Sequence, residues 1–274
     1  MDGRKKPQKT PKLKPTQLRG LYDGLRHMSE GELLTLAKYH VDHPGRIASR
    51  FQKSCEKVAG YRYPEIDEPF HAAPTIPWAE DLPTEIEDTR QFAALLEDRS
   101  RYEVEGLDGF GFRYVDREIF PLRTVAVDGL RPDKRTVDLL LVGDTGRPIV
   151  GELKIRHDSL AYLALIQALM YAAELSSENQ LRRLAAQYPD SDPPFRVEAE
   201  GKRLDILLVG FESEGTNSKE GFKLAMKLRD RLMADRKQRV SSVIGEFEFI
   251  DAASSFSGAG LTFQRRVSAD GSKD

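Results

Sequence analysis

Residues 137–154, VDLLLVGDTGRPIVGELK, carry charged side chains inside two apolar runs at strand spacing. Asp138 lies in the first run, and Glu152 and Lys154 lie in the second. Successive side chains of a strand point to opposite faces, so Glu152 and Lys154 share a face. Charges held among apolar residues cost free energy unless they are paired or used. This stretch is therefore the first candidate for chemistry.

The residues between the two runs favour a tight turn. Asp144 can hydrogen-bond its own backbone, and Gly146 can adopt positive φ. A chain that folds back there is predicted to set Asp138 beside Glu152 and Leu153. Two carboxylates and the ammonium of the lysine would then meet on one face of a hairpin.

Two adjacent carboxylates repel each other, and burying each ion costs several kcal/mol by general estimate, so the pair needs a cation or a shared proton. A hard divalent metal meets that need, because magnesium takes one or two carboxylates and completes its shell with waters and substrate phosphates. Lys154 could then hold an attacking water or neutralise a phosphate. A second interpretation stays open, in which Asp138 and Lys154 form an ordinary salt bridge.

The segment 159–175, SLAYLALIQALMYAAEL, is apolar on nearly every face and predicts a helix buried between other elements. Gln167 and Tyr171 are four residues apart and so share one face of that helix. An unpaired buried amide costs about 1 to 3 kcal/mol, so Gln167 needs a partner. The partner could be a neighbouring carbonyl, or the strand ends that carry Glu152 and Lys154.

Together these residues resemble a known family. Asp138, then Glu152-Leu153-Lys154 after a hairpin, then a helix with Gln167-Ala-Leu-Met-Tyr171, is similar to the PD-(D/E)xK nuclease superfamily and to its RecB-like branch. The resemblance covers about residues 119–175 and the strand that follows. It implies an α/β fold with a restriction-endonuclease-like core of helix, three strands, helix and strand. In that core a mixed central sheet is flanked by helices.

The resemblance also implies a reaction. Asp138 and Glu152 would bind Mg²⁺ or Mn²⁺ with the carbonyl of Leu153, Lys154 would serve the attacking water, and Gln167 would orient the site as the fourth catalytic position. The expected activity is metal-dependent hydrolysis of phosphodiester bonds in nucleic acid, with DNA expected rather than RNA. The alternative is a non-catalytic module on the same fold that binds nucleic acid or another protein.

Two other aspartates could be mistaken for the metal ligand. Asp133 follows a proline, as in the family motif, but it would fall past the hairpin partner of Glu152. Asp205 lies in LDILLVG, which repeats the pattern around Asp138, but no Glu-x-Lys follows it. Asp205 is therefore predicted to be a residue at the start of a central strand.

An upstream acidic residue on the first core helix would also fit the resemblance. Glu85, Glu87 and Glu97 are better candidates than His71, which lies in a proline-rich segment. Each glutamate could equally be a solvated helix carboxylate.

The remaining elements follow from propensity and periodicity. In chain order we expect a helix over 85–100 capped by Thr84, short strands around Pro121, a buried strand over 203–211, a helix over 219–239 and a late strand over 242–250. The basic face of the helix over 219–239 could track phosphates or simply be solvated.

Four regions are predicted. Residues 1–16 form a disordered basic tail, because they contain almost nothing apolar. Residues 17–62 form a helical N-terminal extension, in which Ser29 begins a capping box and Pro44 opens a further helix. A Pro-rich linker follows over 63–83, and a nuclease-like domain spans 84–274. The N-terminal helices could contact substrate, form a homodimer or buttress the core.

Composition sets bounds. A chain of 274 residues can bury a substantial core, and its net charge of -2 does not favour a protein whose whole surface grips duplex nucleic acid. The single cysteine excludes an internal disulfide, and the five histidines show no zinc-ligand spacing. No apolar run suits a membrane span or a signal peptide, so a cytoplasmic protein is expected.

Overall fold

The computed structural model describes residues 16–60, 88–97, 100–121, 136–155, 161–198, 200–211, 219–235, 239–254 and 261–266. The expected tail up to residue 15, the Pro-rich linker, the part of the expected strands that follows Pro121, and Asp133 lie outside these ranges. So do His71, Glu85 and Glu87.

The chain begins with three helices, α1 (Gln17–Leu25), α2 (Glu30–Asp42) and α3 (Pro44–Ala59). Thr16 caps α1 by accepting a hydrogen bond from the backbone N–H of Arg19 at 3.2 Å. The predicted capping box is present at α2, where the Glu32 carboxylate accepts from the backbone N–H of Ser29 at 2.7 Å. Pro44 opens α3, as its fixed φ favours.

The other elements follow in chain order. They are α4 (Thr89–Glu97), β1 (Tyr102–Glu105), β2 (Gly111–Ile119), β3 (Val137–Gly143), β4 (Pro148–Ile155), α5 (Ala161–Leu175), α6 (Glu178–Gln187), β5 (Leu204–Phe211), α7 (Lys219–Ala234), α8 (Arg239–Val243), β6 (Ile244–Ser254) and β7 (Leu261–Arg265). Asp88 Oδ1 accepts from the backbone N–H groups of Arg90 and Gln91, both at 2.9 Å, and so caps α4.

The seven strands form a closed mixed barrel in the order β1-β2-β3-β4-β5-β6-β7. Strand β5 runs parallel to both β4 and β6, and β7 runs parallel to β1. The other neighbours are antiparallel. The expected restriction-endonuclease-like core, with an open mixed sheet flanked by helices, is therefore wrong. Strands β1 and β7 pair with each other, and this pairing leaves the sheet without edges.

The hairpin of β3 and β4 has the predicted turn. Gly146 adopts φ +80°, and its backbone N–H donates to the carbonyl of Gly143 at 2.8 Å. Gly151 lies opposite Leu139. A Cβ atom at residue 151 would come within 2.9 Å of the Leu139 Cβ, so the close pairing just before Glu152 requires a glycine.

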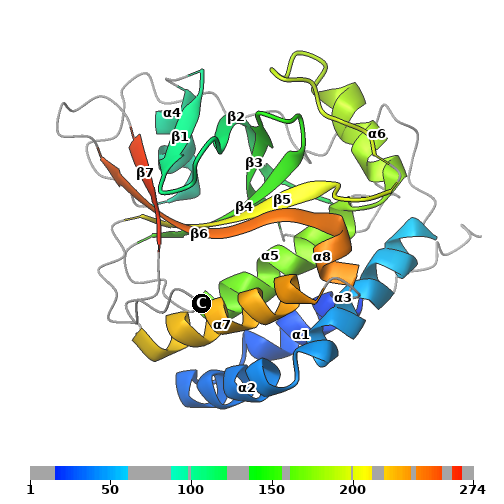
Figure 1. The fold of residues 1–274 in the computed structure, drawn as a ribbon, viewed down its shortest axis with the longest axis vertical. Helices are drawn as coiled ribbons and strands as arrows, with labels where there is room; N and C mark the ends of the chain where they lie inside the picture. Colours follow the sequence, from blue (N-terminus) through cyan, green and yellow to red (C-terminus); the bar gives the residue numbers. More distant parts are fainter. Residues whose placement is uncertain are drawn as a thin grey trace, which may run out of the picture.

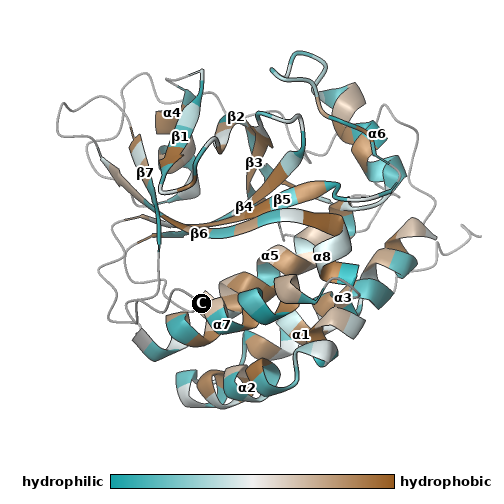
Figure 2. Ribbon diagram, in the orientation of Figure 1, coloured by the Kyte–Doolittle hydropathy of each residue, from teal (hydrophilic) through white to brown (hydrophobic). Residues whose placement is uncertain are grey.

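Inward-facing side chains from all seven strands fill the barrel, and one face of α4 joins them. This inner core contains Phe92, Ala93, Leu96, Tyr102, Val104, Phe112, Leu139, Leu141, Ile149, Leu153, Leu207, Val209, Phe211, Ile250, Ala252, Leu261 and Phe263. Figure 2 shows hydrophobic residues along these strands. Because side chains alternate, the even-numbered residues of β3 and β4 face the other side of the barrel wall.

Helices α1, α2, α3, α5 and α7 all lie on that outer side (Figure 1). Helix α5 lies between the barrel wall and α1 and α3, and nearly all of its residues are buried, which confirms the prediction of a buried helix. The N-terminal helices and α5 share one apolar core with β3 to β6. Helices α1 to α3 therefore join the barrel mainly through α5 and α7, on which they pack.

His40 of α2 is a buried histidine whose Nδ1 lies 2.5 Å from the hydroxyl oxygen of Tyr162 on α5. Burial lowers the pKa of His40 to about 4, with smaller contributions from Arg50 and His43. The unfolded chain, with a histidine pKa near 6.5, binds the proton first. We therefore expect the free energy of unfolding to fall by up to about 3 kcal/mol as the pH drops from about 6.5 to about 4.

Denaturant unfolding across this pH range checks the prediction. His40→Asn should lose much less stability between these pH values than the wild type. Parallel losses in the two proteins would contradict the assignment of this pH dependence to His40.

Candidate functional site

Strands β3 and β4 bring the predicted carboxylates together. Leu139 pairs with Gly151, and one further step in the register sets Asp138 opposite Glu152. The backbone N–H of Leu153 donates to Asp138 Oδ2 at 3.0 Å, and Lys154 Nζ lies 2.9 Å from Glu152 Oε1. Two carboxylates and one ammonium thus share the outer face of the hairpin, as the alternation of residues predicted.

The charges of this cluster are buried to different degrees. Glu152 has no exposed surface, whereas the Lys154 side chain is 19% exposed and Asp138 is half-buried. A buried carboxylate is tolerated when a cation lies against it, and Lys154 fills that role for Glu152. This ion pair gives Lys154 a carboxylate partner, Glu152, that the salt-bridge interpretation of the sequence had not named.

Helix α5 packs on β4, the strand that carries Glu152 and Lys154, and it carries Gln167 and Tyr171 one turn apart on one face. Gln167 Oε1 accepts a hydrogen bond from the hydroxyl of Tyr22 at 2.6 Å. Sequence reasoning indicated that a buried glutamine needs a partner, but it missed Tyr22. No local pattern links a tyrosine on α1 to a glutamine that lies 145 residues further along the chain.

The two tyrosine hydroxyls lie within the electrostatic field of the carboxylates. Burial raises the pKa of Tyr22, and the negative charge of Glu152 raises it further. The pKa of Tyr171 is also well above its usual value, first because of burial and then because of Glu152 and Asp138. Both hydroxyls therefore stay protonated at neutral pH and can act as hydrogen-bond donors.

Strand β2 carries a further carboxylate next to the pair. Ile119 pairs with Val137, so the register sets Glu118 opposite Asp138. Glu118 adopts φ +49°, a left-handed conformation that is uncommon outside glycine. Its carboxylate lies 3.3 Å from Nε of Arg90 on α4. That ion pair directs Glu118 toward α4.

Asp205 is buried in an ion pair at the other end of the barrel wall. Both of its carboxylate oxygens lie 3.0 Å from Arg147 Nε, and Oδ1 accepts from the backbone N–H of Glu246 at 2.7 Å. Burial raises the pKa of Asp205 in spite of these bonds. It is the second residue of β5, in agreement with the prediction of a residue at the strand start.

Glu97, the described member of the upstream carboxylates, is exposed at the end of α4. The apolar side chains of α4 belong to the inner core, on the opposite face of the barrel wall from Glu152. Two arginines of α7 are used within the fold: Arg229 pairs with Glu248 at 2.8 Å, and Arg231 donates to the Val41 carbonyl at 2.6 Å.

The donor set of the cluster fits a hard divalent cation. Asp138, Glu152 and the Leu153 carbonyl offer oxygen atoms, which magnesium and manganese prefer, and Asp138 is the half-buried member of the set. Across the described ranges, no three His, Cys, Asp or Glu side chains come together as a metal-binding group. The fit therefore rests on the two carboxylates and one carbonyl.

Comparison with known proteins adds no relative. No family model matches this chain, and no curated protein or solved structure matches it. None of the helices in the described ranges combines the length and apolar character that crossing a bilayer requires.

Proposed function

We propose that this protein is a metal-dependent nuclease that hydrolyses phosphodiester bonds in nucleic acid, with DNA preferred over RNA. The observation that carries the proposal is the pair of facing carboxylates, Asp138 and Glu152, with the Lys154 ammonium 2.9 Å from Glu152. The proposed activity depends on these side chains alone. They lie on a closed barrel, not on the open sheet expected of an endonuclease-like core.

In this proposal Asp138, Glu152 and the Leu153 carbonyl hold Mg²⁺ or Mn²⁺. The bound ion would withdraw negative charge from the scissile phosphate. Lys154 is partly exposed, so its ammonium can hold a water molecule near the phosphate while it stays against Glu152. Gln167 fixes the orientation of the cluster from α5. We also propose that the protein is cytoplasmic and forms a homodimer.

The test is a cleavage assay with labelled single-stranded DNA, duplex DNA and RNA, each with Mg²⁺, Mn²⁺ or a chelator. We expect metal-dependent cleavage that the chelator abolishes. Lys154→Ala should lower the rate by about a hundred-fold or more, since general acid-base and electrostatic groups contribute effects of this order. Lys227→Ala, which removes an exposed lysine of α7, should retain the wild-type rate.

Two outcomes contradict the proposal. One is the absence of cleavage of every substrate with either metal. The other is full activity in Lys154→Ala. Nucleic-acid binding without cleavage would instead favour the non-catalytic alternative.

A further inference from the structure

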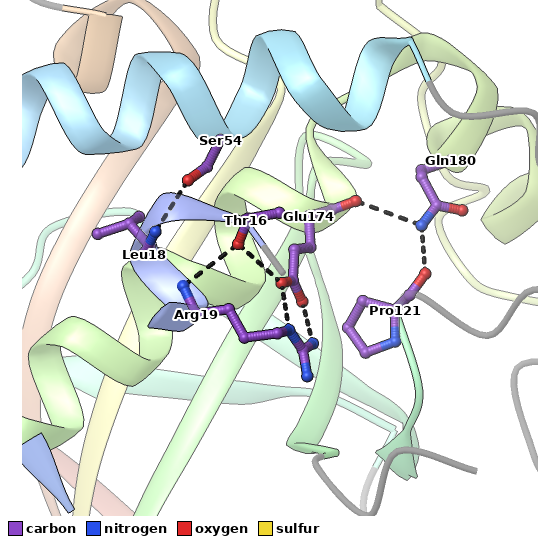
Figure 3. Close-up of polar contacts among 7 residues, drawn as sticks. All are labelled: Thr16, Leu18, Arg19, Ser54, Pro121, Glu174 and Gln180. Atoms are coloured by element: carbon purple, nitrogen blue, oxygen red, sulfur yellow. Dashed lines mark hydrogen bonds and ion pairs between the residues drawn. The ribbon is translucent and has the colours of Figure 1, made fainter. Parts of the chain in front are cut away.

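Helix α1 is held against α5 by a buried ion pair. Arg19 donates to both oxygens of Glu174, from Nε at 2.8 Å and from Nη2 at 2.6 Å (Figure 3). The Thr16 hydroxyl donates to Glu174 Oε1 at 3.3 Å. Glu174 has no exposed surface and Arg19 is 4% exposed, so the contact lies within the helical layer. A bidentate arginine contact restricts both the distance and the rotation of α1 relative to α5.

The same faces of the two helices continue toward the carboxylates. Tyr22 lies one turn after Arg19, and Gln167 lies two turns before Glu174, so the helices run antiparallel along this seam. The Tyr22 hydroxyl donates to Gln167 Oε1 at 2.6 Å, and only 8% of Tyr22 is exposed. Helix α5, which carries Gln167, packs on β4, the strand of Glu152 and Lys154, and the charge of Glu152 raises the pKa of the Tyr22 hydroxyl.

We propose that Tyr22 of α1 is a positioning residue of the candidate metal site and acts on it through Gln167. The N-terminal helices then contribute a residue to the candidate site in addition to packing on α5. This inference rests on the proposed function, because it assigns a role at the same cluster.

The physical basis is the asymmetry of the glutamine amide. A tyrosine hydroxyl that donates to Oε1 makes that atom the accepting end, so Nε2 is the end that donates. Carboxylates such as Glu152 and Asp138 attract hydrogen-bond donors and repel a carbonyl oxygen. Without the Tyr22 hydroxyl, Gln167 loses the contact that holds its amide in one orientation. Partners of this kind, one step removed from a metal, contribute about ten- to a hundred-fold in affinity or activity.

Tyr22→Phe removes the hydroxyl and keeps the ring. We expect kcat to fall about ten-fold while KM changes much less, and the Kd for Mn²⁺ measured by calorimetry to rise about ten-fold. Combining Tyr22→Phe with Gln167→Ala should give no further loss beyond Gln167→Ala alone, because the two residues act as one unit. Tyr162→Phe is the matched control. Tyr162 lies on α5, as Gln167 does, and its buried hydroxyl contacts His40 of α2. This control should keep wild-type kcat and Mn²⁺ affinity.

The possible failures can be told apart. If wild type and Tyr22→Phe cleave equally well and bind Mn²⁺ equally well, while Lys154→Ala is inactive, the role of Tyr22 is refuted and the proposed function stands. Additive losses in the double variant also refute a role through Gln167. If the wild type cleaves nothing, the proposed function fails, and the Mn²⁺ affinities decide on the role of Tyr22. Equal losses of Mn²⁺ affinity in Tyr22→Phe and Gln167→Ala that do not add in the double variant support the inference. An Mn²⁺ affinity that is unchanged in Tyr22→Phe overturns it.

Discussion

Glu152→Gln is expected to lower metal-dependent cleavage by more than about a hundred-fold while the barrel stays folded. Residues that hydrogen-bond to the ligands of a metal already change metal affinity or activity by up to about a hundred-fold, so removal of a direct ligand should lower activity at least as much. The substitution keeps the side-chain shape and removes the charge that would bind the cation. Lys154 is 19% exposed and can reach water when its partner is neutral, so the fold should tolerate the change. Cleavage rates and urea unfolding of the same samples measure both effects.

Glu248→Gln is the matched control for this substitution. Glu248 is also a buried carboxylate, held by Arg229 at 2.8 Å and by Arg265 at 2.9 Å, away from the candidate site. This variant should lose stability and keep its cleavage rate per folded molecule. Equal rate losses in both glutamine variants would mean that Glu152 acts only through the fold.

Arg19→Met should lower the free energy of unfolding by about 3 to 5 kcal/mol. Glu174 would be left without its bidentate partner at a position with no exposed surface, and an uncompensated buried charge is among the most costly defects in a core. The Thr16 hydroxyl, at 3.3 Å from Glu174, supplies only a neutral hydrogen bond. Urea denaturation followed by circular dichroism measures the change.

The double variant Arg19→Met, Glu174→Leu tests the cause. Replacing both charges with apolar side chains removes the buried ions, so most of the lost stability should return. If the double variant is as unstable as Arg19→Met, the loss comes from packing of the arginine stem and not from the orphaned carboxylate.

Local features of this fold were predictable from sequence because their causes are local. The turn at Gly146 and the alternation of β3 and β4 follow from neighbouring residues, and so do the cap at Ser29 and the continuous apolar run of α5. The start of α4 differs from the prediction: Asp88 caps the described helix, while Thr84 lies outside the described residues.

Closure of the barrel depends on contacts far apart in the chain. Strand β1 has four residues, too few for alternation to separate it from a loop, and no strand was predicted there. It pairs with β7, which lies more than 150 residues later, where Val104 faces Phe263. Neither strand carries a signal for the other. An open sheet was therefore the natural prediction, and the structure contradicts it.

In the candidate site too, the residues that could be predicted are those whose positions depend on nearby parts of the chain. Asp138, Glu152 and Lys154 could be grouped because a single hairpin brings them together, and their register needs only the turn. Gln167 could be identified as a buried amide, but its partner Tyr22 could not be named. Tyr22 and the left-handed Glu118 could not be found, because the first depends on the docking of α1 on α5 and the second on an irregularity in β2.

Calorimetric titration of Mn²⁺ into the purified protein and into Asp138→Asn tests directly whether these carboxylates bind a metal. We expect saturable binding of the ion to the wild type and at least a ten-fold weaker affinity in the variant, by the general effect of removing a metal ligand. Wild-type protein that binds no Mn²⁺, or Asp138→Asn that binds it with unchanged affinity, would contradict a metal site at these carboxylates.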